Sequence, residues 1–393
     1  MAVPRTKPGN YPAILSYGFR PFFLGGALFS ALAILFWIPL LYGYLDTESL
    51  FPPVDWHIHE MLFGYLAAII TGFLLTAIPN WTGRLPVQGM PLLVLFLIWL
   101  AGRFAVFFST DIGWIAAAVI DCLFLLAVAA AAATEIIAGK NWRNLKVLIP
   151  VSVLLGANIL FHVEVHRFGA SDVSRRLAIA AAITLIMIIG GRIIPSFTRN
   201  WLVRENPGRL PEPFARLDTG IIAISALSLA SWTFFPHHAV TGILMIVAGI
   251  ANAVRLARWA GDRTFRDPLV LVLHAAFLFV PLGFVLAGTA AIFPDYVPVA
   301  AGIHAFGVGA IGSMTLAVMA RATLGHTGYE LRSSPAMSAM FVGMLAAGVI
   351  RIFAAFFPAS AALLHGSACL WSLSFLAYVA LFGGKLLKPR RRN

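Results

Sequence analysis

Long apolar runs, each about as long as a membrane is thick, recur along the whole chain. They are separated by short segments that hold most of the charged residues. A helical run of about twenty apolar residues spans the ~30 Å hydrocarbon core of a bilayer. The runs rarely alternate between apolar and polar residues, which argues against the strands of a β-barrel. The sequence therefore predicts an all-α, polytopic membrane protein.

We expect twelve membrane helices that form a single integral membrane domain, residues 1–393. The expected spans are 22–44, 57–79, 91–109, 114–138, 147–167, 174–195, 219–235, 239–256, 268–292, 298–320, 335–356 and 361–384. Because 60% of the residues are hydrophobic and only 11% are charged, no segment remains for a soluble domain. The two cysteines, Cys122 and Cys369, lie in apolar runs and argue against a disulfide framework.

The net charge of +12 lies in short loops, so it indicates membrane orientation and not nucleic-acid binding. One alternate set of loops is basic, from Arg5 and Lys7 to the segment 385–392. The other set is mainly acidic, and Arg167, Arg175 and Arg176 are its only basic residues. The positive-inside rule then predicts that both termini are cytoplasmic.

Eight of the ten histidines fall near the outer side in this topology, and neutral imidazole is a common ligand of copper, zinc and haem iron. The outer histidines are His57, His59, His162, His166, His237, His238, His304 and His365, whereas His274 and His326 fall toward the inner side.

Two outer motifs carry closely spaced histidines. In "HVEVH" (162–166), His162 and His166 are four residues apart and can chelate one ion from one helix face; a helix cap is the alternative. In "WHIHE" (56–60), His57 and His59 point ~200° apart on a helix, so they should not share a metal. The alternative there is two interfacial histidines bonded to loop carbonyls.

A repeat links the second, sixth and tenth helices. A constant offset of 245 aligns residues 59–84 with 304–329 and pairs His59 with His304. The segment 194–201 matches 78–84 and pairs Pro195 with Pro79. We predict three four-helix units, near 15–138, 147–256 and 268–384, around a pseudo-threefold axis. Chance similarity between helices rich in Gly and Ala is the alternative.

The same plan resembles the main subunit of the haem–copper oxidases, in which histidines on helices two and ten hold a haem. His59 and His304 occupy comparable places, although architecture alone does not transfer function. His57 lies on a face of small residues that a flat cofactor could approach.

Charged and polar residues near the apolar runs give further candidates. Arg175 and Arg176 could pair with haem propionates, or with Asp172. His274 lies within an apolar helix and is a candidate metal ligand or path residue, or a helix–helix hydrogen-bond partner. The candidate proton carriers are Glu60, Asp121 and Glu135.

Five long motifs resemble the NnrS family over nearly the whole chain. They are "GFRPFFL" (18–24), "WHIHEMLFGYLAAIITGFLLTAIPNWTGR" (56–84), "GGRIIPSFTRNWL" (190–202), "LHAAFLFVPLG" (273–283) and "GIHAFGVGAIGSMTLAVMARATLGHTG" (302–328). The resemblance implies a bacterial inner-membrane protein that contains haem and copper and is associated with nitric oxide metabolism and nitrosative stress.

Three functions follow as hypotheses. The first is a haem- and copper-binding protein that binds nitric oxide or turns it over as an oxidoreductase, with an electron donor that the sequence does not identify. The second is a transporter of a metal, haem or small anion, which would line a path through the bundle with polar residues. The third is a non-catalytic sensor or scaffold for nitric oxide.

Overall fold

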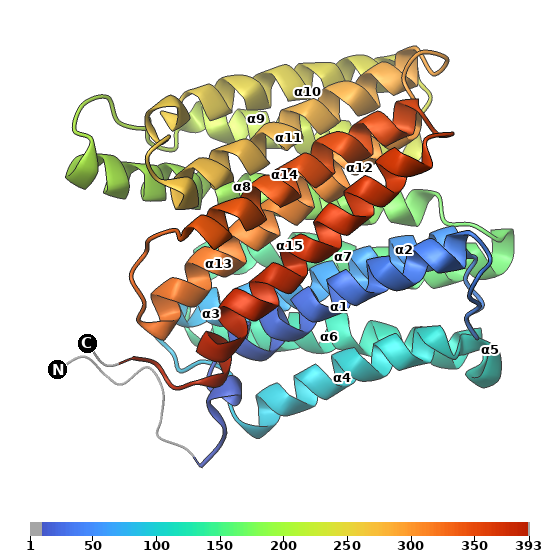
Figure 1. Cartoon of the computed structure of the whole chain (residues 1–393), viewed down its shortest axis with the longest axis horizontal. Coiled ribbons are helices and arrows are strands. Elements are labelled where there is room, and N and C mark those ends of the chain that lie inside the picture. Colours follow the sequence, from blue (N-terminus) through green and yellow to red (C-terminus); the bar gives the residue numbers. More distant parts are fainter. Residues whose placement is uncertain (1–9, 392–393) are drawn as a thin grey trace. The chain divides into compact units, whose positions relative to one another are not determined.

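The computed structural model describes residues 10–391, which form helices joined by loops (Figure 1). Within that part, twelve helices are long and apolar enough to cross a membrane, and there is no strand. The protein is therefore an all-α, multi-pass membrane protein, as the apolar pattern predicted. Arg5, Lys7 and Arg392, which contribute to the predicted orientation, lie outside the described residues.

The spans follow one another through short connections, and several consist of more than one helical element. They are α1 (Phe19–Leu41); α2, η2 and α3 together (Pro53–Thr82); α4 (Met90–Phe107); α6 (Trp114–Ala138); the end of η3 with α7 (Asn144–Phe168); α8 (Val173–Glu205); α9 (Arg216–Phe234); α10 with η4 (Ala239–Arg263); α11 (Pro268–Ile292); α12, η5 and α13 together (Val299–Thr327); α14 (Pro335–Phe356); and α15 (Ala361–Leu387).

The second, sixth and tenth spans are the longest of these twelve, with 30, 33 and 29 residues. The sixth and tenth continue past their expected ends, to Glu205 and Thr327, because their polar C-terminal segments remain helical beyond the apolar run. These are the same three helices that share the sequence motif, so length agrees with the predicted repeat.

Local conformation also agrees between the second and tenth spans. The π-helical segment η2 (Glu60–Leu66) begins directly after His59, and the π-helical segment η5 (Ala305–Gly312) begins directly after His304. Gly83 and Gly328 follow these spans with positive φ angles of 70° and 80°, the left-handed conformation that commonly terminates a helix. Each pair is related by the offset of 245. The match supports the repeat for these two helices, and the threefold grouping stays a prediction.

The chain divides into two compact units. Unit 1 comprises Met1–Ala178, Ala322–Glu330 and Phe375–Asn393. In it α4 packs along α6, and α1 packs against α3 (Figure 1). The buried Arg20 of "GFRPFFL" donates from Nη1 to the carbonyls of Leu386 and Lys388, at 2.7 Å each. These bonds satisfy carbonyls at the end of α15, which lack partners within the helix.

Unit 2 comprises Ile179–Arg321 and Leu331–Ser374. In it α10 packs against both α9 and α11, and η5 packs against α11 and α14. A buried ion pair joins α9 to α10, with Nε of Arg255 3.0 Å from Oδ1 of Asp218. The two π-helical segments thus fall in different units, η2 in unit 1 and η5 in unit 2.

Candidate metal centre

His59 is the last residue of α2 (Pro53–His59), and its side chain is fully buried in unit 1. The rings of Phe51, Phe63 and Phe161 surround its imidazole, with ring centroids at 5.0, 5.1 and 5.2 Å. Phe51 also lies 5.1 Å from the ring of His162. This aromatic shell excludes water, and electrostatic interactions inside it are therefore stronger than at the surface.

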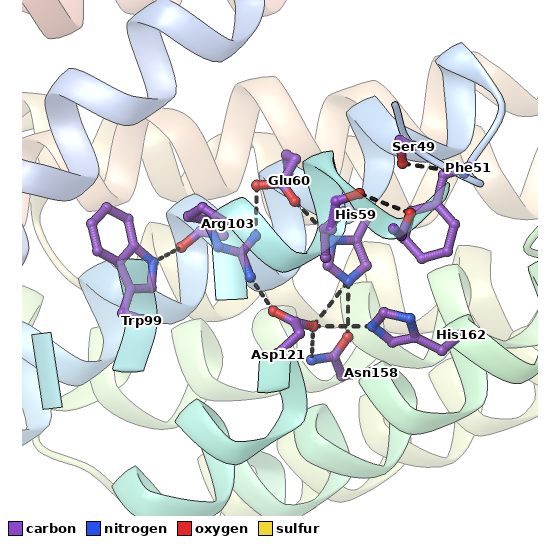
Figure 2. A network of polar contacts seen from close by, with 12 residues as sticks. Ser49, Phe51, His59, Glu60, Trp99, Arg103, Asp121, Asn158 and His162 are labelled. Atoms are coloured by element: carbon purple, nitrogen blue, oxygen red, sulfur yellow. Dashed lines mark hydrogen bonds and ion pairs between the residues drawn. The ribbon is translucent and has the colours of Figure 1, made fainter. Parts of the chain in front are cut away.

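Three side chains that can bind a metal converge at this position from three helices (Figure 2). His59 comes from α2, Asp121 from α6 and His162 from α7 (Leu148–Phe168). One ligand atom of each lies within 4.8 Å of the others, and all three side chains are buried. Nε2 of each histidine lies 3.2 Å from Oδ2 of Asp121. Two imidazoles and a carboxylate are a donor set that copper, zinc or non-haem iron accepts.

A buried ion network adjoins these three residues. Arg103, on α4, donates from Nη1 to Oε2 of Glu60 at 2.6 Å and from Nη2 to Oδ1 of Asp121. None of the three side chains is more than 6% exposed. With neutral histidines, one positive and two negative charges leave an excess of one buried negative charge. Such an excess is costly unless a proton or a cation neutralises it.

The hydrogen bonds of His59 indicate where that positive charge belongs. Its Nδ1 lies 3.0 Å from Oε1 of Glu60, so Nδ1 carries a proton. Its Nε2 lies 3.1 Å from Oδ1 of Asn158 and 3.2 Å from Oδ2 of Asp121. The Asn158 amide is oriented by its Nδ2, which donates to Asp121 at 2.8 Å. His59 Nε2 therefore faces two acceptors, and a second proton or a cation must lie there.

Two other histidines of unit 1, which were expected near the outer side, stack on tryptophans. The ring of His57 lies 4.1 Å from Trp37 at 22°, and the ring of His166 lies 4.2 Å from Trp114 at 15°. Neither belongs to the buried group. The separation of His57 from this group agrees with the helical geometry predicted for "WHIHE".

Of the motif "HVEVH", only His162 joins the buried group. Spacing of four residues predicted a chelating pair, but His166 is exposed and stacked, whereas His162 turns inward to Asp121. Glu164 has a structural role at the start of α8. It accepts from the backbone N–H groups of residues 172–174 at 3.0, 3.1 and 3.0 Å, and from the Ser174 hydroxyl at 2.5 Å.

Arg175 and Arg176, the two candidates for binding haem propionates, form ion pairs with a neighbouring carboxylate. Arg176 binds Asp172 through two bonds of 2.6 and 2.8 Å, and Arg175 lies 3.3 Å from the same carboxylate. The hydrogen bond from Arg176 lowers the pKa of Asp172 below its ordinary value. The structure thus shows the alternative in which both arginines pair with Asp172. Binding of haem propionates by these arginines stays a prediction.

The two candidate histidines of unit 2 each have a defined partner. Nδ1 of His304 donates to the carbonyl of Ala300 at 2.7 Å, which makes Nε2 the basic nitrogen. His274 is buried, and its Nε2 lies 2.8 Å from Oγ1 of Thr198. That hydroxyl donates to Ile194, so His274 donates to it and links α11 to α8. For His274 the helix–helix hydrogen bond is therefore the alternative observed, and a metal-binding role for it stays a prediction.

The sequence identified His59 and His162 as candidate ligands, but it did not reveal most of the residues that surround them. Asp121 was expected only as a proton carrier, and no role was expected for Asn158 or Arg103. One signal could have identified them, because all three are polar residues within apolar membrane helices. Such residues are energetically costly there and are commonly functional.

The fold and this group define a class: a multi-pass helical membrane protein with a buried, anionic His–Asp–His cluster. The chain belongs to the NnrS family, since the family model described as NnrS protein matches residues 13–390. The match covers nearly the whole chain and confirms the resemblance of the five motifs. No match was found among curated proteins.

Proposed function

We propose that this membrane protein serves nitric oxide metabolism or resistance to nitrosative stress, and that it holds copper between His59, Asp121 and His162. Membership of the NnrS family supports the link to nitric oxide. The observation that carries the metal proposal is His59 Nε2, which is directed at two acceptor oxygens inside a group with excess negative charge.

Copper fits these residues by donor type in its oxidised form, Cu(II), and by charge in its reduced form, Cu(I). Imidazole nitrogen and carboxylate oxygen are both established ligands of copper ions. A Cu(I) ion would neutralise the one excess negative charge, whereas a divalent ion would leave one excess positive charge. Oδ1 of Asn158 also faces His59 Nε2 and could complete the donor set.

Bound copper would supply a one-electron couple and a position at which a diatomic molecule could bind. The surrounding residues orient the ligands. Glu60 accepts the Nδ1 proton of His59 and so keeps Nε2 directed at the metal position. Arg103 binds Oδ1 of Asp121 and leaves Oδ2 turned toward both histidines. Phe51 stands against both imidazoles and excludes water.

We also propose that His304 would hold a haem. The bond from its Nδ1 to a backbone carbonyl is typical of metal-bound histidines. Gly307 lies near His304 on the same helix, and no atom comes within 4 Å of the place where a Cβ would stand. A flat ring could therefore approach the backbone there. Because Nε2 of His59 is directed at Asp121, we assign His59 to copper and not to the haem.

The proposal includes the bacterial inner membrane, with both termini in the cytoplasm. The charge difference between alternate loops supports this orientation. In that orientation His59 and His304 both lie near the outer side of the membrane.

Metal analysis of the purified protein tests the copper centre. The wild type should carry copper, and His59→Ala and His162→Ala should each retain less than about a tenth of it. His166→Ala is the matched control, since it removes a histidine from the same helix as His162 but outside the group. Equal copper in all four proteins would disprove the centre, and stoichiometric zinc in its place would refute copper.

Optical spectra and a nitric oxide electrode test the haem and its chemistry. Oxidised, reduced and nitric-oxide-treated wild type should show haem bands that change in His304→Ala. Consumption of nitric oxide with an artificial reductant would identify an oxidoreductase, whereas binding without consumption would identify a sensor or scaffold. A wild type without haem bands would contradict the haem proposal.

A further inference from the structure

Arg351 is the only charged residue of α14, a helix that otherwise consists of apolar and small residues. Its side chain is half-buried. Among the described residues it has no hydrogen bond, ion pair or ring contact. A charged side chain in a membrane helix is costly and usually pairs with an opposite charge or serves function.

The place where α14 crosses η5 puts Arg351 near His304. A Cβ added to Gly348 would come within 2.9 Å of the Cα of Gly309, so the two backbones are in close contact. The two helices follow one another through a turn at 328–334 and run in opposite directions. His304 lies five residues before Gly309, and Arg351 lies three residues after Gly348. Three residues of an α-helix advance about 4.5 Å, and five residues of a π-helix make about one turn, so the two side chains begin at similar depth.

Arg351 and His304 also lie on the faces of the two helices that contact each other. Residues three apart in an α-helix share a face, so Arg351 lies on the same side of α14 as Gly348. A π-helix has hydrogen bonds from residue i to i+5, so residues five apart lie nearly above one another. The π-helical segment thereby brings His304 toward the face of Gly309. The arginine and the histidine thus flank the same contact between α14 and η5.

Unit 1 has a corresponding histidine, glycine and arginine, and it also has a carboxylate that binds the arginine. Gly64 corresponds to Gly309 by the offset of 245, and a Cβ at Gly64 would come within 2.7 Å of Nη1 of Arg103. That arginine binds Glu60, the residue after His59. The corresponding residue after His304 is an alanine. The arginine of unit 2 therefore lacks the carboxylate that its counterpart in unit 1 binds.

We infer that Arg351 binds an anionic ligand beside His304. A guanidinium presents two parallel N–H groups, which match a planar anion with two oxygen atoms. Two sources have this chemistry. One is a propionate of the haem, in which case the inference rests on the haem proposed above. The other is a free anion such as nitrite.

Variants of the full-length protein in detergent distinguish these sources. Arg351→Gln removes the charge, whereas Arg351→Lys keeps the charge but loses the two parallel N–H donors of the guanidinium. Arg332→Gln is the control, because it removes a charge from an exposed loop of the same unit. Loss of a charged hydrogen bond weakens binding about tenfold or more. If the ligand is a propionate, haem per chain falls in Arg351→Gln and less so in Arg351→Lys. If it is a free anion, haem content is unchanged and calorimetry shows nitrite binding weakened by that factor.

Unchanged haem content and unchanged nitrite binding in Arg351→Gln would overturn the inference, because Arg351 would then only extend to the outer interface. If Arg351→Gln does not fold, Arg351→Lys decides by the same two measurements. Wild-type haem together with normal ligand binding in the variants refutes this inference alone. Wild type that binds neither haem nor nitrite refutes it together with the haem proposal, while the copper content of His59→Ala still tests the centre in unit 1.

Discussion

His59 and His304 occupy matching positions on two helices, yet their surroundings differ in charge. Each is the last residue before a π-helical segment, η2 or η5. The residue after His59 is Glu60, an acid that Arg103 binds at 2.6 Å. The residue after His304 is Ala305, and His304 itself donates to a carbonyl of its own helix. The backbone frame is therefore shared, while the polar side chains are not.

On the two proposals above, this difference gives one helical frame two kinds of site. In unit 1 two carboxylates outnumber one arginine, which favours a cation between the histidines and Asp121. In unit 2 Arg351 has no carboxylate partner among the described residues, which favours an anion. Chemistry thus depends on the few polar residues that the frame presents, and the fold alone does not define it.

Arg103→Gln should have the largest effect, because it leaves Glu60 and Asp121 as two buried negative charges without their partner. Removing one member of a buried ion pair costs about 3–5 kcal/mol. The unfolding midpoint in detergent should therefore fall by several degrees. Arg351→Gln is the matched change in unit 2 and should lower the midpoint by less, since it leaves no carboxylate of the chain buried without its partner. Equal losses in both variants would remove the distinction between the units.

Glu60→Gln should weaken copper binding without abolishing it. The carboxylate that orients a ligating histidine typically contributes 10–100-fold to metal affinity. A competition titration with a copper chelator measures this factor. Glu135→Gln is the control, because Glu135 pairs with Arg84 outside the buried group. If Glu60→Gln binds copper as tightly as the control does, Glu60 does not orient His59 toward a metal.

Most of the fold could be predicted from the sequence, because a membrane helix is a local property of about twenty apolar residues. All twelve spans were predicted, and the main differences are the polar ends of α8 and α13, which extend to Glu205 and Thr327. A span predicted from hydropathy stops at the last apolar residue. The helix itself continues for as long as its backbone hydrogen bonds are formed.

The candidate site could be predicted only in part. His59 and His162 were candidates because histidines are rare and were concentrated near one side. Spacing within one helix then paired His162 with His166, since sequence shows only local neighbours. The observed partners, Asp121 and Asn158, come from α6 and α7 and meet His59 only through tertiary packing.

Gly348→Ala tests the close contact on which the placement of Arg351 beside His304 depends. The added Cβ would press on the backbone at Gly309, and overpacking of this kind costs about 1–3 kcal/mol. Gly366→Ala, on α15 in the same unit, adds the same group where no atom lies within 4 Å, so it should not destabilise the protein. Thermal unfolding of the two variants measures the difference. A stable Gly348→Ala variant would show that α14 and η5 are farther apart than the structure has them.

The ion pair between Asp172 and Arg176 in unit 1, the outer pair of the predicted topology, should contribute least, because the carboxylate is 60% exposed. Its pKa lies below the ordinary value of 3.8, since the hydrogen bond from Arg176 favours the ionised form in the folded protein. The stabilisation is therefore present above that value and is lost as the pH falls through the lowered pKa. Asp172→Asn should lower stability by about 0.2–1 kcal/mol at pH 7, and the difference from wild type should shrink as the pH approaches 3. A difference that is the same at both pH values would mean that Asp172 acts through neutral contacts. Unchanged copper content in this variant would separate the outer pair from the buried charges around His59.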